Sequence, residues 1–263
     1  GTIYPIIIEV ITNERMSVGA PYYNSTVLPI ILPGFLIMTI APVLSWKNNK
    51  LPNGKYYLYI IIFICLLFFI FSLFRSLNLW GIIGISTGMW IITGSIYTLY
   101  FKIRSVEKNR TIMTIINNNG LIAHVGVGIL IIGITVSSIY QIEHVKKIKL
   151  NQEITVGNYK LSMDKIEVKD ENNYQSLKGI FSLYKDNNLI NKIYPEKRFY
   201  NVSQIVTTEA GIYHHPLQDF YLVLGEQTDE FWSIKFYQNP LIGLIWLGAF
   251  IMISAGLLSL GKK

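Results

Sequence analysis

Five long apolar stretches without a charged residue constrain this chain more than any other feature of its sequence. A helix needs about 20 predominantly apolar residues to cross the hydrocarbon core of a bilayer. None of the five contains Lys, Arg, Asp or Glu, and Trp and Tyr gather near their ends, as in the interfacial belts of membrane proteins. The predicted spans are 27–46, 57–74, 80–101, 120–140 and 240–260.

The composition excludes two other classes of protein. Of the 263 residues, 15% are charged, against about 25% in ordinary soluble domains, so a purely water-soluble domain does not fit. The 51% of hydrophobic residues exclude a disordered chain. Cys65 is the single cysteine, so the chain has neither an intrachain disulfide nor a CxxCH motif for a c-type haem of its own.

Positive charge in the short connections predicts the orientation in the membrane. With five spans, nine cations fall on one side, the inner side, and the short segments of the other side contain only Arg15 and Arg75. Residues 141–238 are nearly neutral, with 12 Lys or Arg and 13 Asp or Glu, so the net charge of +7 reflects membrane orientation and not nucleic-acid binding. The nine inner cations are Lys47, Lys50, Lys55, Lys102, Arg104, Lys108, Arg110, Lys262 and Lys263.

The sequence therefore predicts a polytopic α-helical membrane protein, with about five transmembrane helices and an inserted small external β domain. Alternating apolar and polar residues predict six to eight short strands in that domain, arranged as a sandwich or a barrel. Pro33 and Pro42 are expected to kink the first span. The predicted domains are an external interfacial segment (1–26), a four-helix membrane region (27–140), the external β domain (141–239), and a C-terminal transmembrane helix with an inner tail (240–263).

His124 is the only Asp, Glu, Lys, Arg or His within the five predicted spans, and ionisable residues in lipid commonly mark a function. Gly120 and Gly128 lie four residues before and after it, on the same helix face. A His between small residues suits a flat macrocycle whose iron it ligates. The same pattern suits helix packing through glycines, as does the Gly84–Gly88 pair in the third span. The residues alone leave both interpretations of His124 open.

Other candidates lie outside the spans. His214 and His215, followed by Asp219, could bind a metal, but adjacent His residues on a strand point in different directions. His144 is expected to be a solvated interfacial residue. Arg198, in the segment 195–198, could receive a carboxylate of a ligand such as a haem propionate, or form a turn-stabilising ion pair, which is the simpler interpretation.

Several motifs resemble the C-terminal part of the CcmF-type haem lyases of cytochrome c maturation. The first residues, GTIYP and MSVGAPYY, are similar to the family's GTLYPL and SVGPPYF stretches, and NGLIAHVG is similar to its GMxxAHxG signature. The order and spacing agree along nearly all 263 residues. The matching segments are 1–5, 16–23, 119–126, 195–200, 219–226, 245–249 and 256–260.

The resemblance implies a cofactor and partners. CcmF-type lyases join haem, delivered by a carrier protein, to the CxxCH thiols of apocytochrome c on the outer side of an energy-conserving membrane. They also hold a b haem, reduced by quinol, between transmembrane His residues, and His124 matches the second of those ligands to the haem iron. No catalytic residue is transferred by the resemblance.

The chain departs from the family at its start. The tryptophan-rich WWD segment, two external haem-ligating His residues and the partner of His124 lie upstream of the matching region in the family. We therefore expect lyase activity to require an N-terminal lyase polypeptide with a WWD segment, or an upstream segment of the same protein, and the sequence leaves open whether this chain acts as an enzyme. The alternative is a structural membrane subunit, a lyase remnant within a larger respiratory or maturation assembly, without ligation activity.

The amino-acid usage concerns the source of the gene. The chain has 44 Ile and 19 Asn but only 6 Ala and 5 Arg, a bias that AT-rich codons produce. A split gene would favour the mitochondrial inner membrane, and the amino-acid usage agrees with that location. The same usage also fits an intracellular bacterium, so the bacterial plasma membrane is the alternative. The domain 141–239 would then face the intermembrane space or the periplasm.

Overall fold

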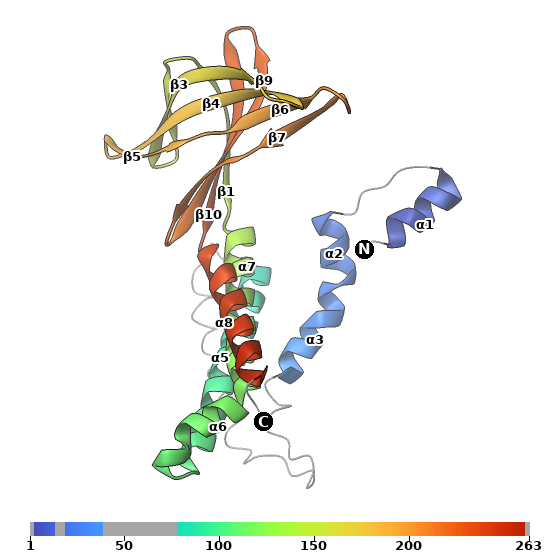
Figure 1. Cartoon of the computed structure of the whole chain (residues 1–263), viewed down its shortest axis with the longest axis vertical. Helices are drawn as coiled ribbons and strands as arrows, with labels where there is room; N and C mark the ends of the chain where they lie inside the picture. Colours follow the sequence, from blue (N-terminus) through green and yellow to red (C-terminus); the bar gives the residue numbers. More distant parts are fainter. Residues whose placement is uncertain (1–2, 14–18, 39–77, 261–263) are drawn as a thin grey trace. The chain divides into compact units, whose positions relative to one another are not determined.

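The computed structural model describes residues 3–13, 19–38 and 78–260 (Figure 1). These residues fall into two compact units, one within 1–131 and 247–263 and the other from Ile132 to Trp246. The first unit is helical, and the second contains a β domain with the adjoining ends of two helices.

Three of the described helices are long and apolar enough to cross a membrane. They lie at the predicted third, fourth and fifth spans, so the chain is a polytopic α-helical membrane protein with a β domain inserted between its last two helices. The three are α5 (Leu79–Arg104), α7 (Asn119–Ile139) and α8 (Gly243–Leu260).

The first two predicted spans are covered only in part. Helix α3 (Leu28–Met38) includes the first half of the span at 27–46 and has Pro33 inside it; Pro42 and the span at 57–74 lie outside the described residues. Before α3 come α2 (Ala20–Thr26) and α1 (Ile3–Thr12), an apolar helix of ten residues that is too short to cross a bilayer.

The helical unit has a small core on α5. Trp90 and Ile91 are buried and pack against side chains of α3 and α7. After the C-terminal end of α5, the 3-10 helix η2 (Lys108–Arg110) and α6 (Thr111–Asn117) lead into α7. There Lys102 Nζ donates a hydrogen bond of 2.7 Å to Asn118 Oδ1, which ties the last turn of α5 to the start of α7.

The β domain contains ten strands in two sheets and is a sandwich (Figure 1). One sheet has the order β1-β10-β9-β8, and the other has the order β2-β3-β4-β6-β7, with β5 also paired to β4; all strand pairs are antiparallel. The strands are β1 (Ile142–Lys149), β2 (Glu153–Val156), β3 (Tyr159–Asp170), β4 (Tyr174–Lys185), β5 (Asn188–Ile193), β6 (Glu196–Tyr200), β7 (Ile205–Glu209), β8 (Gly211–His215), β9 (Gln218–Thr228) and β10 (Phe231–Pro240).

The prediction of six to eight strands was too low, because one edge of β4 pairs with two short strands. Residues 181–185 of β4 pair with β5, and residues 174–178 pair with β6. Pro195, which has no N–H for a strand ladder, lies between β5 and β6. The connection between β4 and β5 is a tight two-residue hairpin, in which Asp186 and Asn187 both have positive φ.

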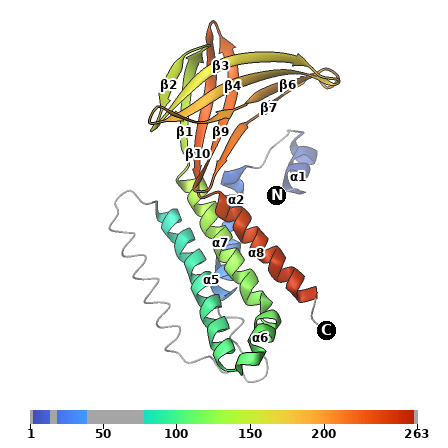
Figure 2. The ribbon, with the colours of Figure 1, turned by 60° about the vertical axis from the view of Figure 1, so that its left-hand side comes forward.

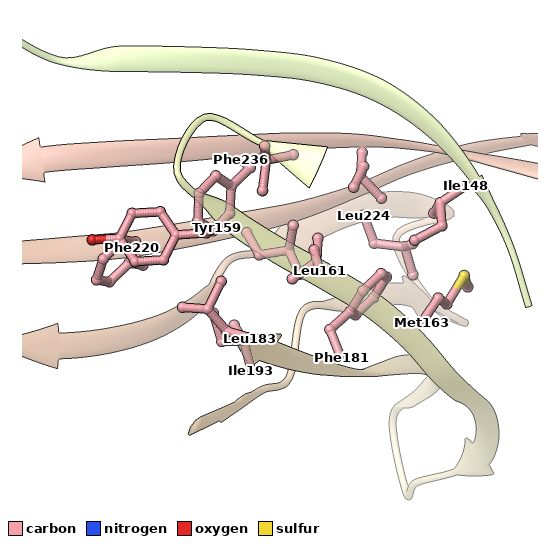
Figure 3. Packing of buried hydrophobic residues seen from close by; sticks show 13 residues of the cluster. Ile148, Tyr159, Leu161, Met163, Phe181, Leu183, Ile193, Phe220, Leu224 and Phe236 are labelled. Carbon is pink, nitrogen blue, oxygen red and sulfur yellow. The ribbon is translucent and has the colours of Figure 1, made fainter. Parts of the chain in front are cut away.

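The sandwich is held by alternate side chains that point between its sheets (Figure 3). On β9, Phe220, Leu222 and Leu224 are buried while the residues between them are more exposed, the period-two pattern of a strand with one core face. The Phe220 ring stacks on Phe236 at a centroid distance of 5.8 Å and meets Tyr159 edge-on at 4.9 Å. Such aromatic pairs contribute about 0.5–1.5 kcal/mol beyond the area they bury.

Candidate functional site

His124 lies in the second turn of α7 and is partly buried. Its ring nitrogen Nδ1 is enclosed and has no hydrogen-bond partner. An enclosed polar atom without a partner costs about 1–3 kcal/mol, so Nδ1 is a hydrogen-bonding atom that the described residues do not satisfy. One turn away, a Cβ added to Gly120 would meet no atom within 4 Å, so α7 presents open space on that side of the His.

Gly128, which was expected to share the open face of His124, lies instead in a helix contact. A Cβ on Gly128 would come within 2.7 Å of the Gly88 carbonyl oxygen and 2.6 Å of Ile92 Cγ1, both on α5. The space beside Gly128 is therefore filled by another helix and not open to a flat ligand. Gly88 is the second glycine of the predicted packing pair, and its contact with Gly128 supports that prediction.

Helix α7 also packs closely against α8 (Figure 2). Gly126 lies against Gly248, and a Cβ on Gly126 would also meet the side chain of Met252 at 2.9 Å. Asn119 Nδ2 donates a hydrogen bond of 2.9 Å to the Ala255 carbonyl oxygen. Glycines let α5 and α8 approach α7 closely on two sides. These contacts fix the height of His124 along the helix axes relative to α5 and α8.

Two buried hydroxyl groups on α5 were not anticipated from the sequence. Ser86 and Ser95 are 8% and 2% exposed, and the Oγ atom of each lacks a hydrogen-bond partner. A signal for Ser95 does exist in the sequence: it lies seven residues after Gly88, hence on the same face of the helix.

The histidines of the β domain do not form a shared metal site. His214 Nδ1 is 2.6 Å from Asp219 Oδ2, while His215 Nδ1 accepts a hydrogen bond from the Leu217 N–H. Within the described part of the chain, no three His, Cys, Asp or Glu side chains are grouped so that they could hold a metal ion. His144 is not the solvated residue we expected, since it is partly buried and its Nε2 is enclosed without a partner.

Arg198 forms an ion pair with Glu196, as the simpler interpretation expected, but both residues lie in strand β6 and not in a turn. Its guanidinium donates to both carboxylate oxygens of Glu196, at 3.0 and 3.1 Å, and the Ser176 hydroxyl donates to the same carboxylate at 2.6 Å. Hydrogen bonds from Arg198, and then from Ser176, hold the pKa of Glu196 below its usual range. The guanidinium also lies over the ring of Tyr174. Its hydrogen bonds to Glu196 and this cation–π contact are therefore made within the β domain.

Comparisons with known proteins give a consistent result. Residues 139–240 match the family model of the CcmF C-terminal β-sandwich. The cytochrome c-type biogenesis protein CycK of Rhizobium meliloti is 28% identical and aligns with 100% of this chain and 40% of its own length. The cytochrome c-type biogenesis protein CcmF of Haemophilus influenzae is 25% identical over 98% of this chain and 41% of its own.

A solved structure shares the fold. The cytochrome c haem lyase CcmF superposes on the whole chain with a TM-score of 0.79 at 16% sequence identity, and the matched region is 42% of that protein. The chain thus spans about two fifths of the length of the relatives that it matches.

Proposed function

We propose that this chain, which matches the C-terminal part of the CcmF-type cytochrome c biogenesis proteins along its whole length, works as the C-terminal part of a cytochrome c haem lyase. In this role it helps to attach haem to the CxxCH thiols of apocytochrome c and supplies His124 as one axial ligand of a transmembrane b haem. The general role in cytochrome c biogenesis rests on the similarity to the family.

The observation that supports the haem site is the state of His124. The imidazole is partly buried, and a Cβ added to Gly120, one helical turn away, would meet no atom within 4 Å. An imidazole on an apolar helix with free space beside it is the donor that haem iron takes in many proteins. When bound there, a b haem would supply a one-electron donor that keeps the incoming haem iron reduced. His124 would hold the iron, and Gly120 would let the macrocycle approach the helix.

The other components of the lyase are proposed from the length of the relatives. A complementary N-terminal lyase segment with a WWD motif would bring the second ligand of the b haem and the site for incoming haem, whether as a separate polypeptide or not. The β domain, Ile142–Pro240, would lie on the outer side of the membrane, where apocytochrome c and the haem-carrier protein meet the lyase, and quinol would supply electrons.

The test is to replace His124 with Gly in the assembled membrane complex. The reduced spectrum should lose b-haem absorption, and maturation of cytochrome c should fall. Exogenous imidazole should restore part of the absorption if His124 is a ligand, because it can enter the space that the side chain leaves. His214→Ala is a matched control that removes an exposed histidine of the β domain, and it should leave the spectrum unchanged. Retention of the b-haem spectrum in His124→Gly would sink the proposal.

The alternative, a structural subunit without ligation activity, is favoured by one observation. The contacts Gly128–Gly88 and Gly126–Gly248 show that α7 packs against two helices, as a scaffold requires. This alternative predicts no b haem on His124 and co-purification with respiratory-complex subunits. Co-purification with cytochrome c maturation proteins would support the lyase.

The chain is a membrane protein, and the relatives named above are bacterial. We propose the mitochondrial inner membrane as its location, from the AT-rich amino-acid usage, with the bacterial plasma membrane as the alternative. Cell fractionation with antibodies to the β domain separates the two locations.

A further inference from the structure

The hydroxyl groups of α5 divide into two kinds. Thr87, Thr93 and Thr98 each donate a hydrogen bond to the helix carbonyl four residues earlier, at 2.7–2.8 Å. Ser86 and Ser95 make no such bond, although their Oγ atoms are enclosed. A hydroxyl in an apolar helix normally donates a hydrogen bond to a backbone carbonyl of its own helix. Ser86 and Ser95 lack this bond and have no other partner among the described residues.

Ser95 faces α7. It lies seven residues after Gly88, and seven residues bring a helix to within about 20° of its starting direction. Because Gly88 contacts Gly128 of α7, the direction that Ser95 shares with Gly88 is toward α7. The 2% exposure of Ser95 agrees with a position between packed helices.

Ser95 also lies at the level of His124. The two helices run antiparallel, since Lys102 bonds to Asn118, whereas Ile92, earlier on α5, meets Gly128, later on α7. His124 lies one helical turn before Gly128 on α7. Ser95 lies about one turn after Ile92 on α5, and because the helices are antiparallel, both steps go in the same direction along the helix axes. Two enclosed atoms without partners, His124 Nδ1 and Ser95 Oγ, therefore lie on facing helices at one height.

We propose that Ser95 is a positioning residue for His124, with its Oγ accepting the Nδ1–H of the imidazole. In the proposed arrangement the Ser95 O–H donates to the Ile91 carbonyl, as the threonines of α5 do to the carbonyls four residues before them. The bond fixes the tautomer in which Nε2 carries the lone pair for a metal. A ligating His generally gives its other N–H to such a partner, which orients the ring and raises its basicity.

This inference rests on the proposed function, and its test separates the two. In the assembled complex, Ser95→Ala should retain the b haem but hold it about 10-fold more weakly, as second-sphere substitutions do. The midpoint potential should rise, because a less basic imidazole donates less to the iron, and the EPR g values of the oxidised haem should shift. Ser95→Cys keeps a weak acceptor in nearly the same volume and should lie between wild type and Ser95→Ala.

Ser86→Ala is the matched control, because Ser86 is also an enclosed, unpartnered serine of α5 but lies more than two turns from Ser95. It should leave potential and g values unchanged. Equal effects of Ser86→Ala and Ser95→Ala, or wild-type values in Ser95→Ala, would overturn the positioning role. A b haem that survives His124→Gly would instead overturn the ligand assignment.

Discussion

Gly126 of α7 and Gly248 of α8 cross so closely that a Cβ on either residue would lie within 2.7 Å of the carbonyl oxygen of the other. No real Cβ occupies such a position, so the two backbones would have to separate if either glycine were replaced. Small residues at helix crossings are the usual means by which membrane helices pack, and this pair joins the two helices that flank the β domain in the sequence.

We predict that Gly248→Ala destabilises the α7–α8 contact, since forcing one methyl group into a closely packed site costs about 1–3 kcal/mol. Thermal unfolding of the full chain in detergent should show a lower midpoint. Gly256→Ala is the control on the same helix, because a Cβ there meets no atom within 4 Å. It should leave the midpoint unchanged or raise it, as Ala favours a helix over Gly by about 1 kcal/mol. Equal midpoints for the two variants would contradict the crossing.

Gly120 and Gly128 should respond in opposite ways. Gly120→Leu places a bulky side chain in the open space beside His124, so haem b should be lost while the chain keeps its thermal midpoint. Gly128→Ala meets Gly88 and Ile92, so the midpoint should fall. Absorption spectra and thermal scans of both variants check this pair of outcomes, and an unchanged haem content in Gly120→Leu would exclude the open face as the haem site.

The Glu196–Arg198 pair should make the stability of the β domain depend on pH. Because the folded pKa of Glu196 is lowered, chiefly by Arg198, the pair stabilises the fold above the ordinary Glu value of 4.5 and loses this contribution as the pH falls through the folded pKa. Glu196→Gln should lower the free energy of unfolding by about 1–2 kcal/mol at pH 7, where charge-assisted hydrogen bonds are lost. It should also flatten the dependence below pH 4.5. Urea titrations at several pH values measure both effects.

Glu230→Gln is the control for that experiment, because the Glu230 carboxylate pairs with Lys149 at 2.7 Å but its side chain is 79% exposed. Solvent screening makes such surface pairs contribute little, so its urea midpoint should match that of the unaltered chain. A loss as large as that of Glu196→Gln would show that partial burial is not what makes the Arg198 pair effective.

The external position of the β domain is open to a labelling test. Val202 is 93% exposed in the turn between β6 and β7, so Val202→Cys should react with a membrane-impermeant maleimide added to intact mitochondria with permeabilised outer membranes, or to bacterial spheroplasts. Lys108→Cys, in the connection between α5 and α7, should react only after the inner membrane is opened. The reverse pattern would invert the orientation predicted from the positive charges.

Much of the fold follows from local patterns. The apolar stretches at 80–101, 120–140 and 240–260 coincide with helices to within three residues at each end, because length and hydropathy largely decide whether a helix can cross a bilayer. The strand at 220–224 shows the predicted alternation, and the turn at Asp186 was recognisable from its residue types. The domain has ten strands and not six to eight, and the pairing of β6 with β4 joins residues about 20 or more positions apart, which local patterns do not reveal.

The sequence by itself determined three of the five predicted membrane spans, the presence of a β domain, the single ionisable residue within the predicted spans and the resemblance to a family. These are properties of short segments, where hydropathy, periodicity and motif spacing act directly. The tertiary structure decided that the domain is a sandwich, that Gly128 of α7 packs against α5, and that Glu196 pairs with Arg198. Each of these features depends on which segments meet in space. The spacing of residues within one segment does not show which other segment packs against a helix face or pairs with a strand edge.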